Sequence, residues 1–303
     1  MNYLRFASID IGSNAIRFLS SYVFETEKGP YFRKGLLVRV PIRLGEDAFR
    51  YGKISTDKEH RMTEAMMSFK HLMSAMDIHS YKAFATSAMR DAINGLELVE
   101  RIEQHTGIHI EIISGEKEAS VISGSQLPHF IEQEEEMLYM DLGGGSTEFT
   151  ILRKDDYIQE SFNIGTIREL FHTVHSKEWK RLKKWLKTHG LLKSGIPILG
   201  SGGNINKIYK IKREHNAAYH ILPKDLADFY NSIKDLSYQE RIVKHQLNPD
   251  RADVIKPACE IFMKVIEMVE CQKIYVPKLG LSDGIVRDLY EEYIEESKHV
   301  IYP

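Results

Sequence analysis

Two stretches of the sequence place a carboxylate directly before a glycine turn and polar side chains directly after it. In residues 137–150, an apolar run ends in Asp141, three glycines follow, and Ser146, Thr147 and Glu148 open the next run. Glycines allow a backbone to approach a ligand closely and to turn its amides toward an anion. Carboxylate oxygens are the ligands that a hard cation prefers. This stretch is therefore typical of a loop that binds a phosphate and its metal ion.

A similar pattern occurs in residues 3–17, where an apolar run ends in Asp10 and a glycine turn follows. A third variant, residues 196–206, leads into a helical pattern. Repetition of one pattern in both halves of the chain indicates two related domains that face each other across a cleft. A plain duplication of a strand and a turn is the alternative, but it would not require aspartate at both turns. The candidate phosphate contacts in the three loops are Gly12, Ser13, Asn14, Gly143, Gly144, Gly145, Ser146, Thr147, Gly202 and Gly203.

These loops need strands before them and helices around them. Alternating apolar and polar residues predict strands over 3–25, around the first turn, and over 31–40. Residues 44–49 are interpreted as a break in this pattern. Apolar residues spaced three and four apart predict a helix over 57–76, whose methionine-rich stripe is interpreted as a core face. Further elements are predicted as a strand at 81–86, a helix at 91–105, a strand at 108–113 and a helix that begins near residue 114.

A polar segment without a clear period, residues 126–136, separates the two halves. We place the domain boundary just before it, which gives domains at 1–124 and 125–303. The last helix is expected either in the second domain or packed back on the first. Elements predicted in the second half are a strand into Asp141, a basic helix at 176–187, a long helix introduced by Pro249, a strand at 274–276 and a helix at 281–294.

The basic helix carries five lysines and one arginine between residues 176 and 187. A solvated face is the simpler interpretation, and a local track for a polyanion is the alternative. The chain as a whole has a net charge of −2, which gives no general reason to expect nucleic acid or an acidic membrane as a partner.

Composition favours an ordinary globular protein of two domains, with 43% hydrophobic and 28% charged residues. The two cysteines, Cys259 and Cys271, have no metal-ligand spacing and indicate a reducing compartment. No run approaches the ~20 apolar residues of a membrane span, and no secretory signal opens the chain. We therefore expect a cytoplasmic protein. No Walker A loop, redox Cys-x-x-Cys motif or histidine metal site is visible.

Several motifs, taken together, resemble those of the exopolyphosphatase and guanosine pentaphosphate phosphohydrolase family, within the superfamily of actin, sugar kinases and heat-shock chaperones. They occur in the family's order and span nearly the whole chain. The motifs are residues 10–17, 85–90, 113–119, 141–148, 200–203 and 251–255.

The resemblance implies an α/β fold of two actin-like (ribonuclease H-like) domains, each a mixed five-stranded sheet flanked by helices, with an interdomain cleft. It also implies roles for single residues. Glu118 matches the family's catalytic base, which spacing alone could not distinguish from Glu116. Arg90 matches an arginine that contacts phosphate. Asp141 matches a catalytic and metal-binding carboxylate, joined by Glu148.

Phosphoanhydride hydrolysis requires neutralised phosphoryl charge, a positioned water and an acceptor for its proton. Arg17 and Arg90 can give bidentate contacts to phosphate. Asp141, Glu148 and Asp10 are the expected ligands of Mg²⁺ or another divalent cation.

The sequence departs from the family pattern at two places. Asn204 stands where a threonine is usual, and Ser282 and Asp283 stand where arginine and glutamate are common. The second exchange removes a positive charge, which would affect the affinity for long polyanions more than hydrolysis. The chain also looks like a short, two-domain member, because the extra helical domains of larger members do not follow before Pro303.

The function expected from this resemblance is exopolyphosphatase activity, with metal-assisted attack of water on terminal phosphates of inorganic polyphosphate. Guanosine pentaphosphate (pppGpp) hydrolysis by the same residues is the first alternative. A sugar or acetate kinase and a non-catalytic (p)ppGpp or polyphosphate sensor are the others. Expected partners are polyphosphate or pppGpp as substrate, with ppGpp as a further ligand, no nucleic acid and no membrane, in a homodimer by family analogy.

Overall fold

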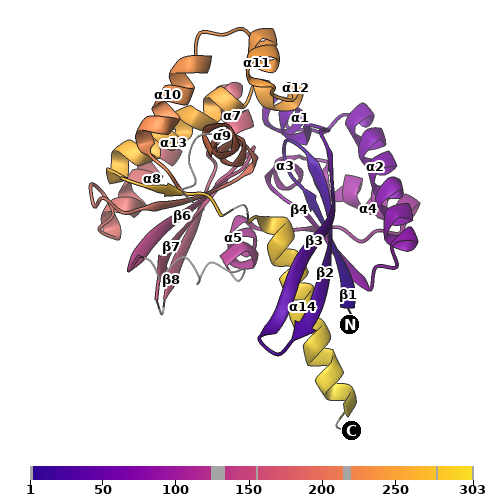
Figure 1. Cartoon of the computed structure of the whole chain (residues 1–303). Helices are drawn as coiled ribbons and strands as arrows, with labels where there is room; N and C mark the ends of the chain where they lie inside the picture. Colours follow the sequence, from indigo (N-terminus) through magenta and orange to yellow (C-terminus); the bar gives the residue numbers. More distant parts are fainter. Residues whose placement is uncertain (1–2, 124–133, 155, 214–219, 278, 302–303) are drawn as a thin grey trace. The chain divides into compact units, whose positions relative to one another are not determined.

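The computed structural model describes residues 3–123, 134–154, 156–213, 220–277 and 279–301, which divide into two compact units (Figure 1). Unit 1 consists of Met1–Ser125 and Gly280–Pro303, and unit 2 of Gln126–Leu279. The expected boundary, between residues 124 and 125, lies outside the described residues. The expected second domain reached Pro303, whereas the contacts place the last helix with unit 1, the other position considered for it.

Unit 1 is built on a five-stranded mixed sheet in the order β3-β2-β1-β4-β5. The first three strands form an antiparallel meander, and β4 and β5 run parallel to β1. The strand over 31–40 is confirmed within β3, whereas the strand expected at 108–113 is only two residues long. The strands are β1 (Tyr3–Ile11), β2 (Ile16–Thr26), β3 (Gly29–Val40), β4 (Ser80–Ala85) and β5 (Glu111–Ile112).

Helices pack on both faces of this sheet. The predicted helix over 57–76 is confirmed as α2. The ring of its Phe69 stacks on the ring of Phe18 of β2, with ring centroids 5.2 Å apart. On the other face, Tyr290 of the last helix contacts Phe6 of β1 and Phe32 of β3. The helices are α1 (Leu44–Tyr51), α2 (Thr56–Ala75), α3 (Ser87–Asp91), α4 (Gly95–Thr106), α5 (Gly115–Ser123) and α14 (Leu281–Ile301).

One helix of unit 1 contradicts the sequence interpretation. Residues 44–49, interpreted as a break, belong to α1. The helix is short and follows Arg43, whose φ of 62° lies in the left-handed region. A helix of eight residues after such a turn is too short to show a clear helical period in the sequence.

Unit 2 repeats the strand order of unit 1 and adds one strand. Its sheet runs β10-β11-β9-β6-β7-β8, so that β8-β7-β6-β9-β11 corresponds to β3-β2-β1-β4-β5. Five strands were expected, and the sixth, β10, pairs antiparallel with β11 at the edge. The strands are β6 (Glu136–Leu142), β7 (Thr147–Arg153), β8 (Tyr157–Phe162), β9 (Ile198–Ser201), β10 (His220–Ile221) and β11 (Ile274–Tyr275).

The long helix introduced by Pro249 is in fact two helices, α12 and α13. Pro257, near the start of α13, has no N–H to donate to the carbonyl of Asp253, and its ring crowds that carbonyl, so a continuous helix is interrupted there. The helices of unit 2 are α7 (Thr166–Leu170), α8 (Ser176–Thr188), α9 (Gly203–Arg213), α10 (Pro223–Ile233), α11 (Tyr238–His245), α12 (Pro249–Ala252) and α13 (Ile255–Val269).

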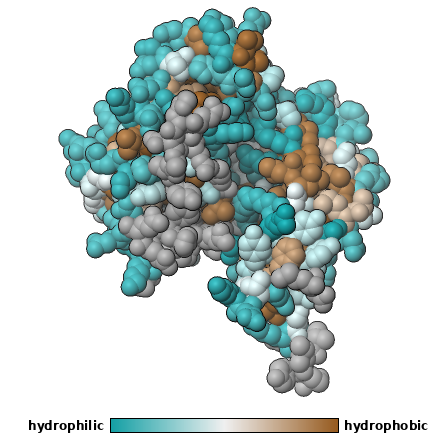
Figure 2. All heavy atoms as spheres, in the orientation of Figure 1, coloured by the Kyte–Doolittle hydropathy of each residue, from teal (hydrophilic) through white to brown (hydrophobic). Residues whose placement is uncertain are grey.

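The surface is mostly hydrophilic (Figure 2), as expected for a chain in which 28% of the residues are charged. Figure 2 shows mainly hydrophilic residues on the visible face, with a hydrophobic patch on unit 1. Exposed hydrophobic side chains of unit 1 include Tyr51, Ile93 and Leu96. No helix in the described part of the chain is long and apolar enough to cross a membrane.

Candidate functional site

The first glycine turn joins β1 and β2 and brings Asp10 beside Arg17. The two residues are register partners in the antiparallel pair, and Arg17 Nη1 donates to Asp10 Oδ2 at 2.7 Å. Asp10 is 3% exposed, and a buried carboxylate requires a charged or hydrogen-bonding partner. Arg17, expected to bind phosphate, thus compensates a residue that was expected to bind metal.

Two helices of unit 1 hold the first turn in place. The amides of Gly45 and Arg43, at the start of α1, donate to the carbonyls of Ser13 and Asn14 at 2.8 and 3.1 Å. A methyl group on Gly45 would lie 2.8 Å from Cβ of Ser13, so only glycine allows this approach. The hydroxyls of Ser13 and Ser87, at the start of α3, are 2.9 Å apart.

Arg90 and Glu118 lie at the same edge of the unit 1 sheet, where β4 and β5 end. Arg90 Nη1 donates to the carbonyl of Ile113 at 2.7 Å, which connects α3 to the segment before α5. Glu118 lies in the first turns of α5, where its amide donates to the carbonyl of Ser114. Glu118 is half-buried and its Oε2 is shielded from solvent, whereas Glu116 is exposed.

The second glycine turn joins β6 and β7 and pairs the two carboxylates predicted there. Asp141 and Glu148 are register partners, so their side chains extend from the same face of the sheet. Glu148 is 1% exposed, and its Oε1 accepts a 2.9 Å hydrogen bond from the hydroxyl of Ser161 on β8. Ser161 was not predicted as a site residue.

The segment after β8 fixes the three carbonyls of the glycine run. Thr166 N donates to Gly143 O at 3.1 Å, Ile167 N to Gly144 O at 2.8 Å, and Arg168 Nε to Gly145 O at 2.6 Å. A methyl group on Gly165 would lie 2.4 Å from the carbonyl oxygen of Gly144. The conformation of the glycine run therefore depends on residues 165–168, which were not predicted as site residues.

The hydroxyl of Thr147 also forms a hydrogen bond within the protein. Its Oγ1 donates to the carbonyl of Ile164 at 2.5 Å and is fully buried. In this conformation its proton is not directed at a ligand, although Thr147 was predicted to contact phosphate.

The third glycine turn adjoins the second at Asp141. Ser201, the last residue of β9, is the parallel register partner of Asp141. Gly202 follows with a φ of 110°, which favours glycine, and a methyl group there would lie 2.5 Å from the carbonyl oxygen of Leu142 and 3.5 Å from Oδ1 of Asp141. Gly203 then begins α9. Unit 2 thus gathers two predicted phosphate loops around one carboxylate.

The three expected metal ligands come from both units. No group of three or more His, Cys, Asp or Glu side chains placed to hold a metal ion occurs among the residues that the structure describes. Asp141 and Glu148 are neighbours in unit 2, whereas Asp10 belongs to unit 1 and pairs with Arg17. Mg²⁺ is commonly bound through one or two carboxylates plus substrate phosphates, so the pair in unit 2 fits this ion.

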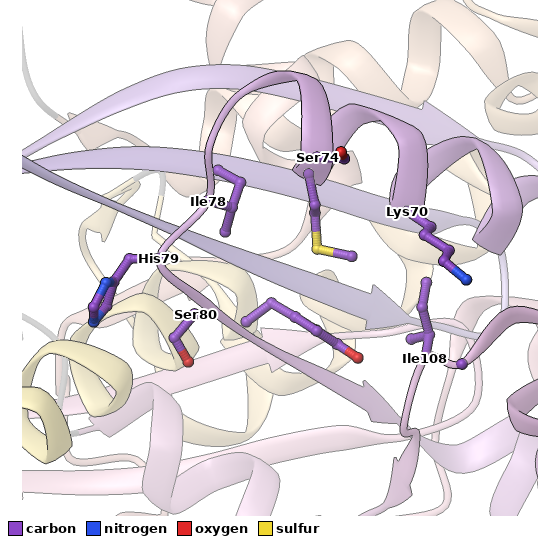
Figure 3. Close-up of a pocket in the computed structure, with 9 residues that line it drawn as sticks. Lys70, Ser74, Ile78, His79, Ser80 and Ile108 are labelled. Atoms are coloured by element: carbon purple, nitrogen blue, oxygen red, sulfur yellow. The ribbon is translucent and has the colours of Figure 1, made fainter.

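A pocket of about 340 Å³ lies elsewhere in unit 1 (Figure 3). His79 and Ser80, which precede and begin β4, line it, whereas the candidate residues follow the opposite end of the strands. It contains none of the predicted site residues, so we do not assign the chemistry to it. Its lining residues are Lys70, Met73, Ser74, Ile78, His79, Ser80, Tyr81, Gly107 and Ile108.

The sequence relatives include phosphatases. The chain is 27% identical to a bifunctional 3-dehydroquinate synthase/phosphatase of Fusobacterium nucleatum, over 88% of this chain and 43% of that protein. It is 26% identical to exopolyphosphatase 1 of Mycobacterium bovis, over 48% of this chain and 41% of that protein. Each match thus spans less than half of the relative's length. Exopolyphosphatase 2 of Mycobacterium tuberculosis is 23% identical, over 95% of this chain and 99% of that protein.

Solved structures confirm the fold. A Ppx/GppA family member of Aquifex aeolicus superposes with a TM-score of 0.74 at 24% identity, over 97% of this chain and 99% of that chain. An exopolyphosphatase of Cytophaga hutchinsonii superposes with a TM-score of 0.79 at 20% identity, over 95% and 98%. The expected α/β fold of two units, each a mixed sheet flanked by helices, is therefore confirmed.

The family model described as the Ppx/GppA phosphatase family matches residues 38–292. This range includes the arginine of α3, the glutamate of α5 and both glycine turns of unit 2. The first glycine turn lies before residue 38 and so outside this range. It is related to the second turn by its motif at 10–17 and by the strand order that the two units share. The chain belongs to the Ppx/GppA phosphatase family.

Proposed function

We propose that the protein is an exopolyphosphatase, which hydrolyses the terminal phosphoanhydride bond of inorganic polyphosphate by attack of water. The observation that carries the proposal is the pairing of Asp141 with Glu148 beside two glycine turns, one of them fixed by residues 165–168. Two of the relatives are exopolyphosphatases, and one of these matches the chain along nearly its whole length.

In this proposal, different residues bind the phosphate and the metal ion. Backbone amides of the glycine turns and the hydroxyl of Ser146 bind phosphate oxygens, and Arg90 adds charge-assisted bonds, having used one of its five donors on Ile113. Asp141 and Glu148 would hold Mg²⁺, directly or through its waters. When bound, the ion would neutralise charge that develops on the phosphoryl oxygens.

Glu118 accepts the proton of the attacking water. A general base needs to be positioned by a rigid element and partly withdrawn from solvent, and the half-buried carboxylate on α5 meets both conditions. Glu116, two residues earlier, is exposed and serves as a natural control.

The test compares Glu118→Gln with Glu116→Gln in an assay of phosphate released from polyphosphate with Mg²⁺. We expect kcat of Glu118→Gln to fall by about 10²- to 10⁴-fold, the usual contribution of a general base, with substrate affinity retained. Glu116→Gln should stay within about twofold of the wild type, as expected for an exposed residue outside the chemistry. If Glu118→Gln retained its turnover, Glu118 would not be the general base.

The same assay with pppGpp decides the substrate. Faster phosphate release from pppGpp than from polyphosphate would make the protein a pppGpp phosphohydrolase. Tight binding of either compound without turnover in the wild type would make it a sensor. Both results would contradict the proposed exopolyphosphatase.

A further inference from the structure

Helix α8 concentrates positive charge on its exposed side. Five of its lysines are exposed, and none of the five forms an ion pair within the described part of the chain. The helix's one acid, Glu178, is buried and accepts hydrogen bonds from Asn163 N and Arg181 Nη2. The charge of the helix is thus not balanced on its own surface. We name these residues the lysine face: Lys177, Lys180, Lys183, Lys184 and Lys187.

Packing fixes the direction in which the lysine face points. Leu182 and Leu186 are fully buried in the core of unit 2. Trp185 packs against Phe149 and Phe162, with ring centroids 6.3 and 5.9 Å away. The apolar side of the helix is therefore occupied by the core, and the lysines extend to solvent.

Arginine contacts tie the helix to β8. Arg181 pairs with Glu160, donates to the carbonyl of Ser161 at 2.6 Å and lies 4.1 Å from the ring centroid of Phe162. Arg181, which is not one of the lysine face residues, therefore holds the middle of the helix against β8.

The helix begins beside the segment that holds the second glycine turn. Glu178, in its first turn, accepts the 2.9 Å bond from Asn163, and Gly165 packs against the carbonyl of Gly144. Lys177, Lys180, Lys184 and Lys187 are spaced three, four and three residues apart, so they share one side of the helix. At 1.5 Å per residue they extend over roughly 15 Å away from that segment.

We infer that the lysine face is a docking surface for the distal part of a linear polyphosphate chain whose terminal phosphate is held at the glycine turns. This inference rests on the proposed function and adds a subsite to it. Lysine ammonium groups are point charges without a fixed fork, which suits a flexible chain that carries charge at every unit. A row of such charges binds a polyanion by charge complementarity and not by sequence or shape.

Other polyanions fit this surface less well. Proteins that bind single-stranded nucleic acids commonly combine a basic groove with exposed aromatic rings on which the bases stack. Trp179 is instead covered by Lys264, whose Nζ lies 3.7 Å from the ring centroid, and Trp185 is packed against the sheet. A membrane-bound amphipathic helix needs a free apolar side, and that side of α8 is taken by the core.

The test is a binding measurement that does not depend on turnover. The triple variant Lys180→Gln/Lys184→Gln/Lys187→Gln is titrated with fluorescently labelled long-chain polyphosphate and with tripolyphosphate, in EDTA so that metal-dependent hydrolysis is prevented. We expect roughly tenfold weaker binding of the long chain, from three lost charge contacts, and unchanged binding of tripolyphosphate. The slope of log Kd against log salt should fall by about two, as for three contacts to a single-stranded polyanion.

The control removes three exposed lysines elsewhere in unit 2, in Lys193→Gln/Lys224→Gln/Lys244→Gln, of which Lys193 and Lys244 are paired with Glu270 and Glu240. It should bind like the wild type, and a triple Lys→Arg variant of the lysine face should retain binding of the long chain. Equal weakening in the control and in the test variant would overturn the inference. So would tighter binding of single-stranded DNA or anionic vesicles to the wild-type lysine face than of polyphosphate. Absence of hydrolysis in the presence of Mg²⁺ would instead count against the proposed function alone.

Discussion

At the scale of single residues, the buried carboxylate of Glu148 shows how the site is arranged. Its register partner Asp141 lies on the same face of the sheet, and Ser161 on the next strand donates to its Oε1 at 2.9 Å. A hydroxyl that donates to a carboxylate oxygen restricts the rotation of the group and fixes its orientation. Ser161 is therefore a positioning residue in the proposed metal site.

We predict that Ser161→Ala weakens the apparent affinity for Mg²⁺ by about tenfold or more, the usual effect of removing such an outer hydrogen bond. The free energy of unfolding should fall by only about 1 kcal/mol. Phosphate release measured across a Mg²⁺ titration checks the first value and urea unfolding the second. Ser161→Thr retains a hydroxyl and should restore metal affinity. An unchanged Mg²⁺ dependence in Ser161→Ala would exclude the positioning role.

Sequence reasoning proposed residues within one turn and did not propose those that contact the turn from elsewhere in the fold. Asp141, Glu148 and the glycines between them are adjacent in the sequence, so their types and spacing indicated their chemistry. Ser161 and Arg168 contact the same turn from more than ten residues away, and only strand pairing brings them there. The ion pair between Asp10 and Arg17 was likewise not foreseen, because register was not predicted.

At the scale of elements, α1 supports the first glycine turn and is itself held by a buried ion pair. Lys58 Nζ lies 2.6 Å from Asp47 Oδ1 and donates to the carbonyl of Arg43 at 2.8 Å, while Ser55 N donates to Asp47 Oδ2 at 3.0 Å. The pair joins α1 to α2. Since Gly45 of α1 donates to Ser13, the pair also stabilises the position of the turn.

We predict that Asp47→Asn lowers the free energy of unfolding of unit 1 at pH 7 by about 2 to 3 kcal/mol, because the buried Lys58 ammonium loses its partner at 2.6 Å and keeps only the more distant Glu46, at 3.7 Å. Asp57→Asn, an exposed change on α2, should be nearly neutral. Urea unfolding followed by circular dichroism measures both. A loss no larger than that of Asp57→Asn would show that the pair contributes little.

The same pair determines a dependence on pH. Burial raises the pKa of Asp47, but hydrogen bonds from Lys58 and Ser55 outweigh it, so the pKa lies below the ordinary 3.8. A carboxyl with a lowered pKa contributes stability above its unfolded pKa and loses it as the pH falls through the folded pKa. The stability difference between wild type and Asp47→Asn should therefore be complete near neutral pH and shrink below about pH 4.

At the scale of the whole molecule, the repetition of one pattern predicted two related units, and the common strand order confirms it. Each carboxylate and turn sits at the end of the same first strand of its sheet, β1 or β6. The sixth strand could not be foreseen, because β10 is two residues long and carries no measurable period. The position of the last helix was left open, since its amphipathic pattern shows that one side is buried but not against which sheet.

That helix makes unit 1 discontinuous in sequence, which gives a test of how the molecule unfolds. Tyr290 of α14 is 9% exposed and contacts Phe6 and Phe32, so Tyr290→Ala should cost unit 1 about 3 kcal/mol. Both tryptophans of the chain, Trp179 and Trp185, belong to unit 2, and their fluorescence reports on that unit alone.

We predict that Tyr290→Ala moves the part of the urea transition that belongs to unit 1, seen by far-ultraviolet circular dichroism, to lower denaturant and leaves the tryptophan transition in place. The reason is that each unit has its own core, so a cavity in one does not remove contacts from the other. Leu226→Ala, in the core of unit 2, is the reciprocal control and should move the tryptophan transition by a similar amount. If Tyr290→Ala shifts both signals equally, the two units unfold as a single cooperative block, and α14 stabilises the entire chain instead of unit 1.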